Sequence, residues 1–283
     1  MRWGSGRRSS NVEDRRGMRV SPRMAGGGLG AIVIIVLALV FGVDPRLLMQ
    51  GMGTQTSTQA PAPQYEQTGP DPMKEFVAVV LADTEDTWGA LFRQAGADYQ
   101  EPTLVLFSGA VQSPCGFAQA AVGPFYCPAD RKVYIDLDFY RDLRERFQAP
   151  GDFAQAYVIA HEIGHHVQNL LGVADKVRGT QQRVSEAQAN DLSVRMELQA
   201  DCLAGIWAHH ANRSRQILEE GDVEEALNAA SQIGDDRMQM RAQGYVSPDS
   251  FTHGSAEQRA RWFRRGLETG DLEGCNTFQA ARL

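Results

Sequence analysis

The chain carries two histidines four residues apart, His161 and His165, with a glutamate, Glu162, directly after the first. Apolar residues recur at helical spacing around them, and residues four apart on a helix share one face. Two imidazoles on one face can bind the same metal ion, and zinc accepts neutral imidazole nitrogens readily. The carboxylate of Glu162 would then lie next to a water on the metal, in the position of a general base. The motif predicts a hydrolytic site with one Zn²⁺ per chain.

A catalytic zinc site needs a third protein ligand, and a later helical segment, 180–211, offers one. Glu197 and Asp201 are again four residues apart. We expect Glu197 to complete the coordination and Asp201 to accept the distal N–H of a ligand histidine. The alternative is a pair of solvated acids on a helix surface, which would be the default interpretation without the histidine motif.

Other histidines compete for a place in this site. His209 and His210 lie twelve and thirteen residues beyond Glu197. This is about 18–20 Å along a helix, too far for either histidine to share a metal with Glu197. We therefore expect both to act as cations near the C-terminus of the helix. His166 follows His165 directly and points to another face, which indicates packing or a supporting contact behind the ligands.

Peptide hydrolysis also requires a group that stabilises the oxyanion of the tetrahedral intermediate. His253, just before the last helical segment, is the first candidate, and Arg259, six residues later, is the second. A capping or surface histidine is the alternative interpretation of His253.

Helical segments dominate the chain after residue 71, and they must position these side chains. Apolar residues recur at helical spacing over 73–95, 153–171, 180–211, 223–233 and 255–268. The last segment opens with a capping box of Ser255 and Gln258. Two short β-prone runs, 103–107 and 132–137, come before the histidine motif. The pattern predicts a mainly helical α+β domain with a small sheet, and 132–137 is the expected edge strand for a peptide substrate.

The N-terminal part of the chain has a different composition. Residues 1–25 contain seven arginines and two acidic residues, and the 18 residues 26–43 carry no charge. A helix of that length spans about 27 Å, close to the hydrocarbon thickness of a bilayer. We therefore expect one transmembrane helix at 26–43, and the positive-inside rule places the disordered basic tail, 1–25, in the cytoplasm. A segment rich in Thr, Gln and Pro follows, which predicts a flexible linker at 44–71 and an exported domain at 72–283. A cleaved signal peptide and a buried core helix are the alternatives.

Charge narrows the class of partner. The first 25 residues contribute +5 to the total charge of −7, so the remainder of the chain has a charge of −12. Phosphate binding requires a basic face, and an acidic body therefore argues against nucleic acid as the main partner.

The cysteines fit an exported domain. All four follow the apolar segment: Cys115, Cys127, Cys202 and Cys275. An even number of cysteines in an exported domain suggests disulfides. We expect Cys115 to pair with Cys127, and Cys202 with Cys275, among three possible connectivities. A structural zinc site is the rival, although the chain has no C-x-x-C spacing.

Several segments together resemble the bacterial putative neutral zinc metallopeptidase family (YpfJ-like). They occur in order along nearly the whole chain: MRWGSGRRSSNVEDRRG, GPFYCPADRKVYIDLDFY, AHEIGHHVQ, RMELQADCLAGIWAHH, SQIGDDRMQ and SFTHGSAEQRARWF. The resemblance implies a zinc-dependent, membrane-anchored enzyme, whose description as a peptidase rests largely on its motif.

The order of H-E-x-x-H, E-x-x-x-D and a late histidine followed by an arginine is also similar to the gluzincins, especially the HtpX and CAAX-protease type. This likeness implies a zincin-like domain, with the same ligands, base and oxyanion groups as those proposed from the residue types. Those relatives embed their sites among several membrane spans, so their membrane-protein substrates do not carry over. We expect a membrane-anchored zinc endopeptidase acting on peptides or proteins; a non-proteolytic envelope module and a cell-wall amidase are the rivals.

Overall fold

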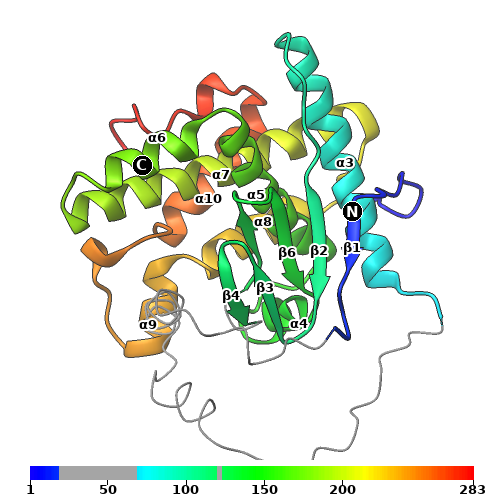
Figure 1. The fold of residues 1–283 in the computed structure, drawn as a ribbon, viewed down its shortest axis with the longest axis horizontal. Helices are drawn as coiled ribbons and strands as arrows, with labels where there is room; N and C mark the ends of the chain where they lie inside the picture. Colours follow the sequence, from blue (N-terminus) through cyan, green and yellow to red (C-terminus); the bar gives the residue numbers. More distant parts are fainter. Residues whose placement is uncertain (19–68, 120–122) are drawn as a thin grey trace, which may run out of the picture.

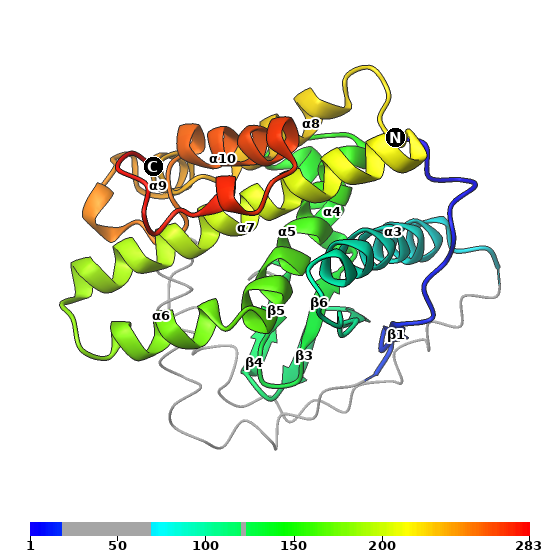
Figure 2. The same ribbon diagram turned by 90° about the horizontal axis from the view of Figure 1, so that it is seen from above.

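The computed structural model describes residues 1–18, 69–119 and 123–283, shown in two views in Figures 1 and 2. Among these residues, no helix is both long enough and apolar enough to cross a membrane. The predicted transmembrane helix at 26–43 and nearly all of the predicted linker lie outside the described residues.

A four-stranded mixed sheet has the order β1–β2–β6–β5. β1 (Val12–Asp14) and β6 (Lys132–Asp136) both run parallel to β2 (Thr103–Phe107), whereas β5 (Phe125–Cys127) runs antiparallel to β6. The prediction that 132–137 forms an edge strand is wrong, because β6 has a hydrogen-bonded neighbour on each side. The edge beside it belongs to β5.

Different elements cover the two faces of the sheet. One face is covered by α3 (Pro72–Gln94), α4 (Asp138–Glu145) and α5 (Asp152–Leu170). The other is covered by the hairpin of β3 (Ala110–Ser113) and β4 (Gly116–Gln119). Successive side chains of a strand point to opposite faces. Leu104 and Leu106 of β2 therefore join the main core with α3 and α5, whereas Val105 and Phe107 pack in a second cluster with the β3–β4 hairpin.

The rest of the domain is helical. It contains α6 (Val173–Gln181), α7 (Glu186–Arg215), α8 (Asp222–Gln232), α9 (Asp235–Gln243) and α10 (Ala256–Thr269), with short 3₁₀ turns η3 (Pro248–Ser250) and η4 (Glu273–Cys275). Figure 2 shows the long helix α7 lying between α5 and α10. Glycines permit the contact with α10: a Cβ on Gly266 would lie 1.9 Å from the carbonyl oxygen of Cys202 on α7. The fold is thus the expected mainly helical α+β domain with a small sheet.

The single helix expected over 180–211 is divided in two. α6 ends at Gln181, and α7 begins after Ser185. The Ser185 hydroxyl accepts the backbone N–H of Gln188, and the Gln188 side chain accepts that of Ser185. This capping box begins α7 after Ser185, a boundary that the helical periodicity of 180–211 did not reveal. The box predicted for Ser255 and Gln258 opens α10 as expected.

The prediction of a disordered tail at 1–25 is wrong for residues 1–18. β1 pairs with β2 from Val12 opposite Leu104 to Asp14 opposite Leu106. The Trp3 ring packs edge-on against Phe76 of α3, with 5.4 Å between ring centroids. Figure 1 shows this segment, in blue, along the side of α3 and the edge of the sheet. The N-terminal segment is therefore part of the domain.

Both expected disulfides are present. Cys115, in the turn between β3 and β4, is bonded to Cys127 at the end of β5, and Cys202 of α7 is bonded to Cys275 of η4. All four cysteines of the chain are therefore paired.

Candidate metal centre and active-site groove

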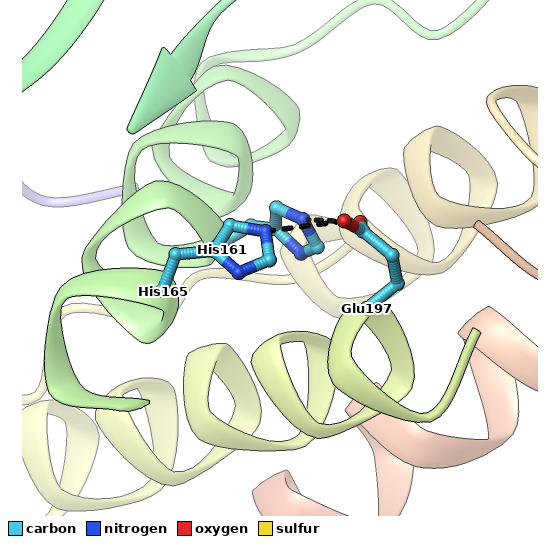
Figure 3. Close-up of side chains that lie close together, drawn as sticks. All are labelled: His161, His165 and Glu197. Atoms are coloured by element: carbon cyan, nitrogen blue, oxygen red, sulfur yellow. Dashed lines mark hydrogen bonds and ion pairs between the residues drawn. The ribbon is translucent and has the colours of Figure 1, made fainter. Parts of the chain in front are cut away.

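His161 and His165 of α5 meet Glu197 of α7, as Figure 3 shows. Each residue offers one ligand atom, and the three atoms lie within 4.8 Å of one another. Nε2 of His161 is 3.1 Å from one carboxylate oxygen of Glu197, and Nε2 of His165 is 3.4 Å from the other. Two imidazole nitrogens and one carboxylate form the protein donor set of many catalytic zinc sites. The three predicted ligands therefore converge on one point and fit zinc.

A glycine lets the two ligand helices approach. Gly164 lies between the two histidines of the motif, and a Cβ there would lie 2.9 Å from the carbonyl oxygen of Ala200 on α7. Real Cβ atoms almost never approach other atoms so closely. A larger residue at Gly164 would push α5 away from α7 and separate the histidines from Glu197.

The second nitrogen of each histidine has its own partner. Nδ1 of His161 is 2.8 Å from Asp201 Oδ1, and Nδ1 of His165 is 2.9 Å from Gln168 Oε1. The Gln168 amide nitrogen donates to the Met196 carbonyl at 2.8 Å, which turns its oxygen toward His165. Both Nδ1 atoms therefore donate a proton, and both Nε2 atoms face the metal position.

Asp201 is a fully buried acceptor behind His161. It also accepts the Tyr157 hydroxyl at 2.5 Å and two N–H groups of Arg259 at 2.9 and 3.0 Å. Burial alone would raise the pKa of Asp201, but the positive charge of Arg259 lowers it, so the carboxylate is ionised. Arg259 is itself only 3% exposed. The structure directs its donors at Asp201, whereas the sequence suggested an oxyanion role.

The charges around His161 favour a cation in this position. Burial works against protonation, but the carboxylates of Asp201 and Glu197 raise the pKa of His161 to about 10. A proton and a metal ion therefore compete for Nε2, and metal binding would release the proton.

Glu162 lies beside the ligands and is 8% exposed. Burial raises the pKa of its carboxyl, and the neighbouring His165 and His161 partly offset that effect. A carboxylate whose pKa is raised accepts a proton more readily than an ordinary surface glutamate.

His253 faces the same groove from the loop before α10, with about a third of its side chain exposed. Its Nδ1 lies 3.1 Å from Oδ1 of Asp235, at the start of α9. The other oxygen, Oδ2, accepts the backbone N–H groups of Thr252, His253 and Gly254 at 2.6–3.0 Å. Partial burial lowers the pKa of His253, but the hydrogen bond to Asp235 raises it above its ordinary value. Asp235 thus holds both the loop and the ring.

The remaining histidines serve the packing. His166 is fully buried, with Nδ1 3.0 Å from the Tyr126 hydroxyl and Nε2 2.6 Å from the Gln100 carbonyl. Burial lowers the pKa of His166 to about 4, so the ring is neutral. His209 and His210 contact carbonyl oxygens near the end of α10, at 2.8 and 2.9 Å.

The sequence analysis did not identify three residues that support the ligands or His253: Tyr157, Gln168 and Asp235. Tyr157 and Gln168 stand four residues before His161 and three after His165, so helical spacing could have revealed them. Asp235 precedes His253 by 18 residues and joins it only through the fold.

These residues surround a groove of about 630 Å³. Glu162, His253 and the three candidate ligands line it. The groove is also lined by apolar residues of β4, β5, α4, α6 and α9; they include Phe117, Phe125, Phe139, Val177 and Met238. A cleft with mostly apolar walls and a few convergent polar groups is typical of a substrate site.

The chain is similar to uncharacterised proteins of two bacteria. It is 50% identical over 289 residues to the uncharacterised protein YpfJ of Escherichia coli (strain K12), covering 98% of this chain and 99% of YpfJ. It is 41% identical over 260 residues to the uncharacterised protein Rv2575 of Mycobacterium tuberculosis (strain H37Rv), covering 87% and 86% of the two chains. No solved structure shows a significant match. Residues 1–278 match the family described as putative neutral zinc metallopeptidase, and the chain belongs to that family.

Proposed function

We propose that the chain is a zinc-dependent endopeptidase. The observation that carries the proposal is the convergence of His161, His165 and Glu197 on a groove that Glu162 also lines. Family membership supports zinc and a peptide substrate in general terms.

The chain's own residues provide the remaining chemistry. When bound, zinc supplies a Lewis acid that polarises the scissile carbonyl and makes water easier to deprotonate. Glu162 accepts the proton of the attacking water and passes it to the leaving amine. Protonated His253, held by Asp235, donates a hydrogen bond to the oxyanion. Arg259 holds Asp201, which in turn orients His161.

The substrate is proposed to bind as an extended chain along β5. Within the described residues β5 is the last strand of its sheet, and Phe125 and Tyr126 line the groove together with the metal residues. A peptide added at such an edge gains backbone hydrogen bonds. The Tyr126 hydroxyl, which contacts His166 and Asn169 of α5, fixes the distance between this edge and the ligand helix.

The catalytic proposal is tested with Glu162→Gln. The full chain is the appropriate protein, because β1 completes the sheet and a fragment starting at residue 72 would lack it. We expect wild type and variant to bind one zinc ion each, and only wild type to cleave a diverse peptide library. Cleavage by the variant would refute the role of Glu162. Zinc binding without cleavage by either protein would favour the rival, a non-proteolytic zinc-containing envelope module.

The β5 proposal is tested with Tyr126→Phe, which keeps the ring and removes the hydroxyl. Loss of the hydroxyl removes the contacts that hold this edge against α5, so KM should rise, with kcat and zinc affinity nearly unchanged. Tyr245→Phe is the matched control, because Tyr245 is 62% exposed on another surface. An equal fall in kcat and unchanged KM would argue against this placement of the substrate.

We also propose that the domain lies outside the cytoplasm and that the apolar segment 26–43 contacts the membrane. Two disulfides support the compartment, because they persist in oxidising surroundings. The length and apolar character of 26–43 support the membrane contact. The bacterial inner membrane is the expected location. Recovery of the chain in the soluble fraction after gentle lysis would refute the membrane contact.

A further inference from the structure

The N-terminal segment, residues 1–18, is joined to the domain by backbone hydrogen bonds. β1 pairs with β2 over three residues, and the bonding continues at each end. The Leu104 N–H donates to the Asn11 carbonyl at 2.8 Å, and the Arg15 N–H donates to the Leu106 carbonyl at 2.8 Å. Further back, the Ser9 N–H donates to the Ala78 carbonyl of α3 at 2.9 Å.

A buried carboxylate on α3 strengthens this attachment. The Glu85 side chain is 1% exposed and receives three donors, all from the N-terminal segment. Arg7 donates at 2.7 Å, the Ser9 hydroxyl at 2.5 Å and the Asn11 amide at 2.8 Å. A buried carboxylate is costly without such partners. The Glu85 site is therefore built to receive this segment.

The arginines that suggested a cytoplasmic tail are engaged in the fold. Within residues 1–18, each arginine has an acidic partner, at distances from 2.5 to 3.7 Å; they are Arg2, Arg7, Arg8, Arg15 and Arg16. Arg7 and Arg8 pair with α3, and Arg16 also reaches Asp71 at 2.7 Å. These charges stabilise contacts within the domain, so their number is a poor guide to membrane orientation.

We infer that residues 1–18 lie on the same side of the membrane as residues 69–283. Hydrogen bonds of about 3 Å cannot form across a hydrocarbon layer of about 30 Å. A single crossing between residues 18 and 69 would put β1 and the other three strands of its sheet in different compartments. The predicted single-pass topology, with a cytoplasmic N-terminus and an exported domain, therefore conflicts with the fold. Membrane contact by 26–43 is compatible with the inference only if the chain enters and leaves the membrane on the same side.

The test uses single cysteines in the full chain. Because the four native cysteines are paired, Ser10→Cys or Ala187→Cys introduces one free thiol. Ser10 and Ala187 are both exposed, one beside β1 and the other on α7. Cells whose inner membrane is intact are treated with a membrane-impermeant maleimide, and labelling is compared with that after the membrane is opened. The unsubstituted chain gives the background.

We expect both thiols to be labelled equally before the membrane is opened. Labelling of Ala187→Cys alone, with Ser10→Cys reacting only after opening, would overturn the inference and restore the single-pass topology. Protection of both thiols until opening would support a shared side but refute the proposed location outside the cytoplasm. The experiment does not require activity, so its outcome is independent of the peptidase proposal.

Discussion

Two buried carboxylates organise different parts of the molecule in similar ways. Asp201 receives an arginine, a hydroxyl and a histidine N–H, and Glu85 receives an arginine, a hydroxyl and an amide N–H. They differ in the arginine: Arg259 is buried with Asp201, whereas the Arg7 side chain is 47% exposed. The first network lies behind a metal ligand, and the second fastens the N-terminal segment. One carboxylate should therefore govern zinc and stability together, and the other stability alone.

The largest effect is expected for Asp201→Asn. The substitution keeps the size of the side chain but leaves the buried Arg259 without a counter-charge, which typically costs about 3–5 kcal/mol. Replacing the charged partner of His161 with a neutral amide should also weaken zinc binding by about 10–100-fold. Urea unfolding and competitive zinc titration measure the two effects.

Asp191→Asn is the matched control for Asp201→Asn. Asp191 lies on the same helix and pairs with Arg195, but its side chain is 53% exposed. An exposed pair contributes at most about 1 kcal/mol, and zinc binding should not change. Wild-type zinc affinity in Asp201→Asn would contradict the support of His161 by Asp201.

A smaller effect is expected for Glu85→Gln. The carboxylate that receives Arg7, Ser9 and Asn11 is lost, and charge-assisted hydrogen bonds of this kind are worth about 2 kcal/mol. Unfolding should require less urea, and residues 1–18 should become more accessible to protease. Zinc affinity should stay at the wild-type value, because Glu85 does not contact the metal residues.

Asp86→Asn is the control that compares the exposed partner of Arg7 with the buried one, Glu85. Asp86 also contacts Arg7, at 3.0 Å, but its side chain is 44% exposed. The expected loss of stability is about 0.5 kcal/mol. Equal losses in Glu85→Gln and Asp86→Asn would show that burial does not distinguish the two contacts.

The metal centre could be predicted from the sequence because its signals are local. His161 and His165 are four residues apart on one helix, and Glu197 and Asp201 are four apart on another. Helical geometry then limits which side chains can meet. The Ser255 capping box was predicted for the same reason. The disulfide pairs were predicted because four cysteines allow only three connectivities.

The contacts of the N-terminal segment could not be predicted from the sequence, because its partners are remote along the chain. Glu85 lies 78 positions after its partner Arg7, and Glu75 lies 67 positions after its partner Arg8. A cluster of arginines predicts a charge but not the acid that neutralises it. The same holds for β6, since whether a strand is central or at an edge depends on strand order and not on its own residues. His253 was identified, but its partner Asp235 became visible only in the fold.

The metal centre itself is tested most directly by anomalous X-ray diffraction at the zinc edge, on crystals of the full chain grown with zinc. We expect one strong peak within about 2.0–2.2 Å of Nε2 of His161, Nε2 of His165 and a carboxylate oxygen of Glu197. A peak held by other residues, or no peak at these three, would contradict the assignment of this site.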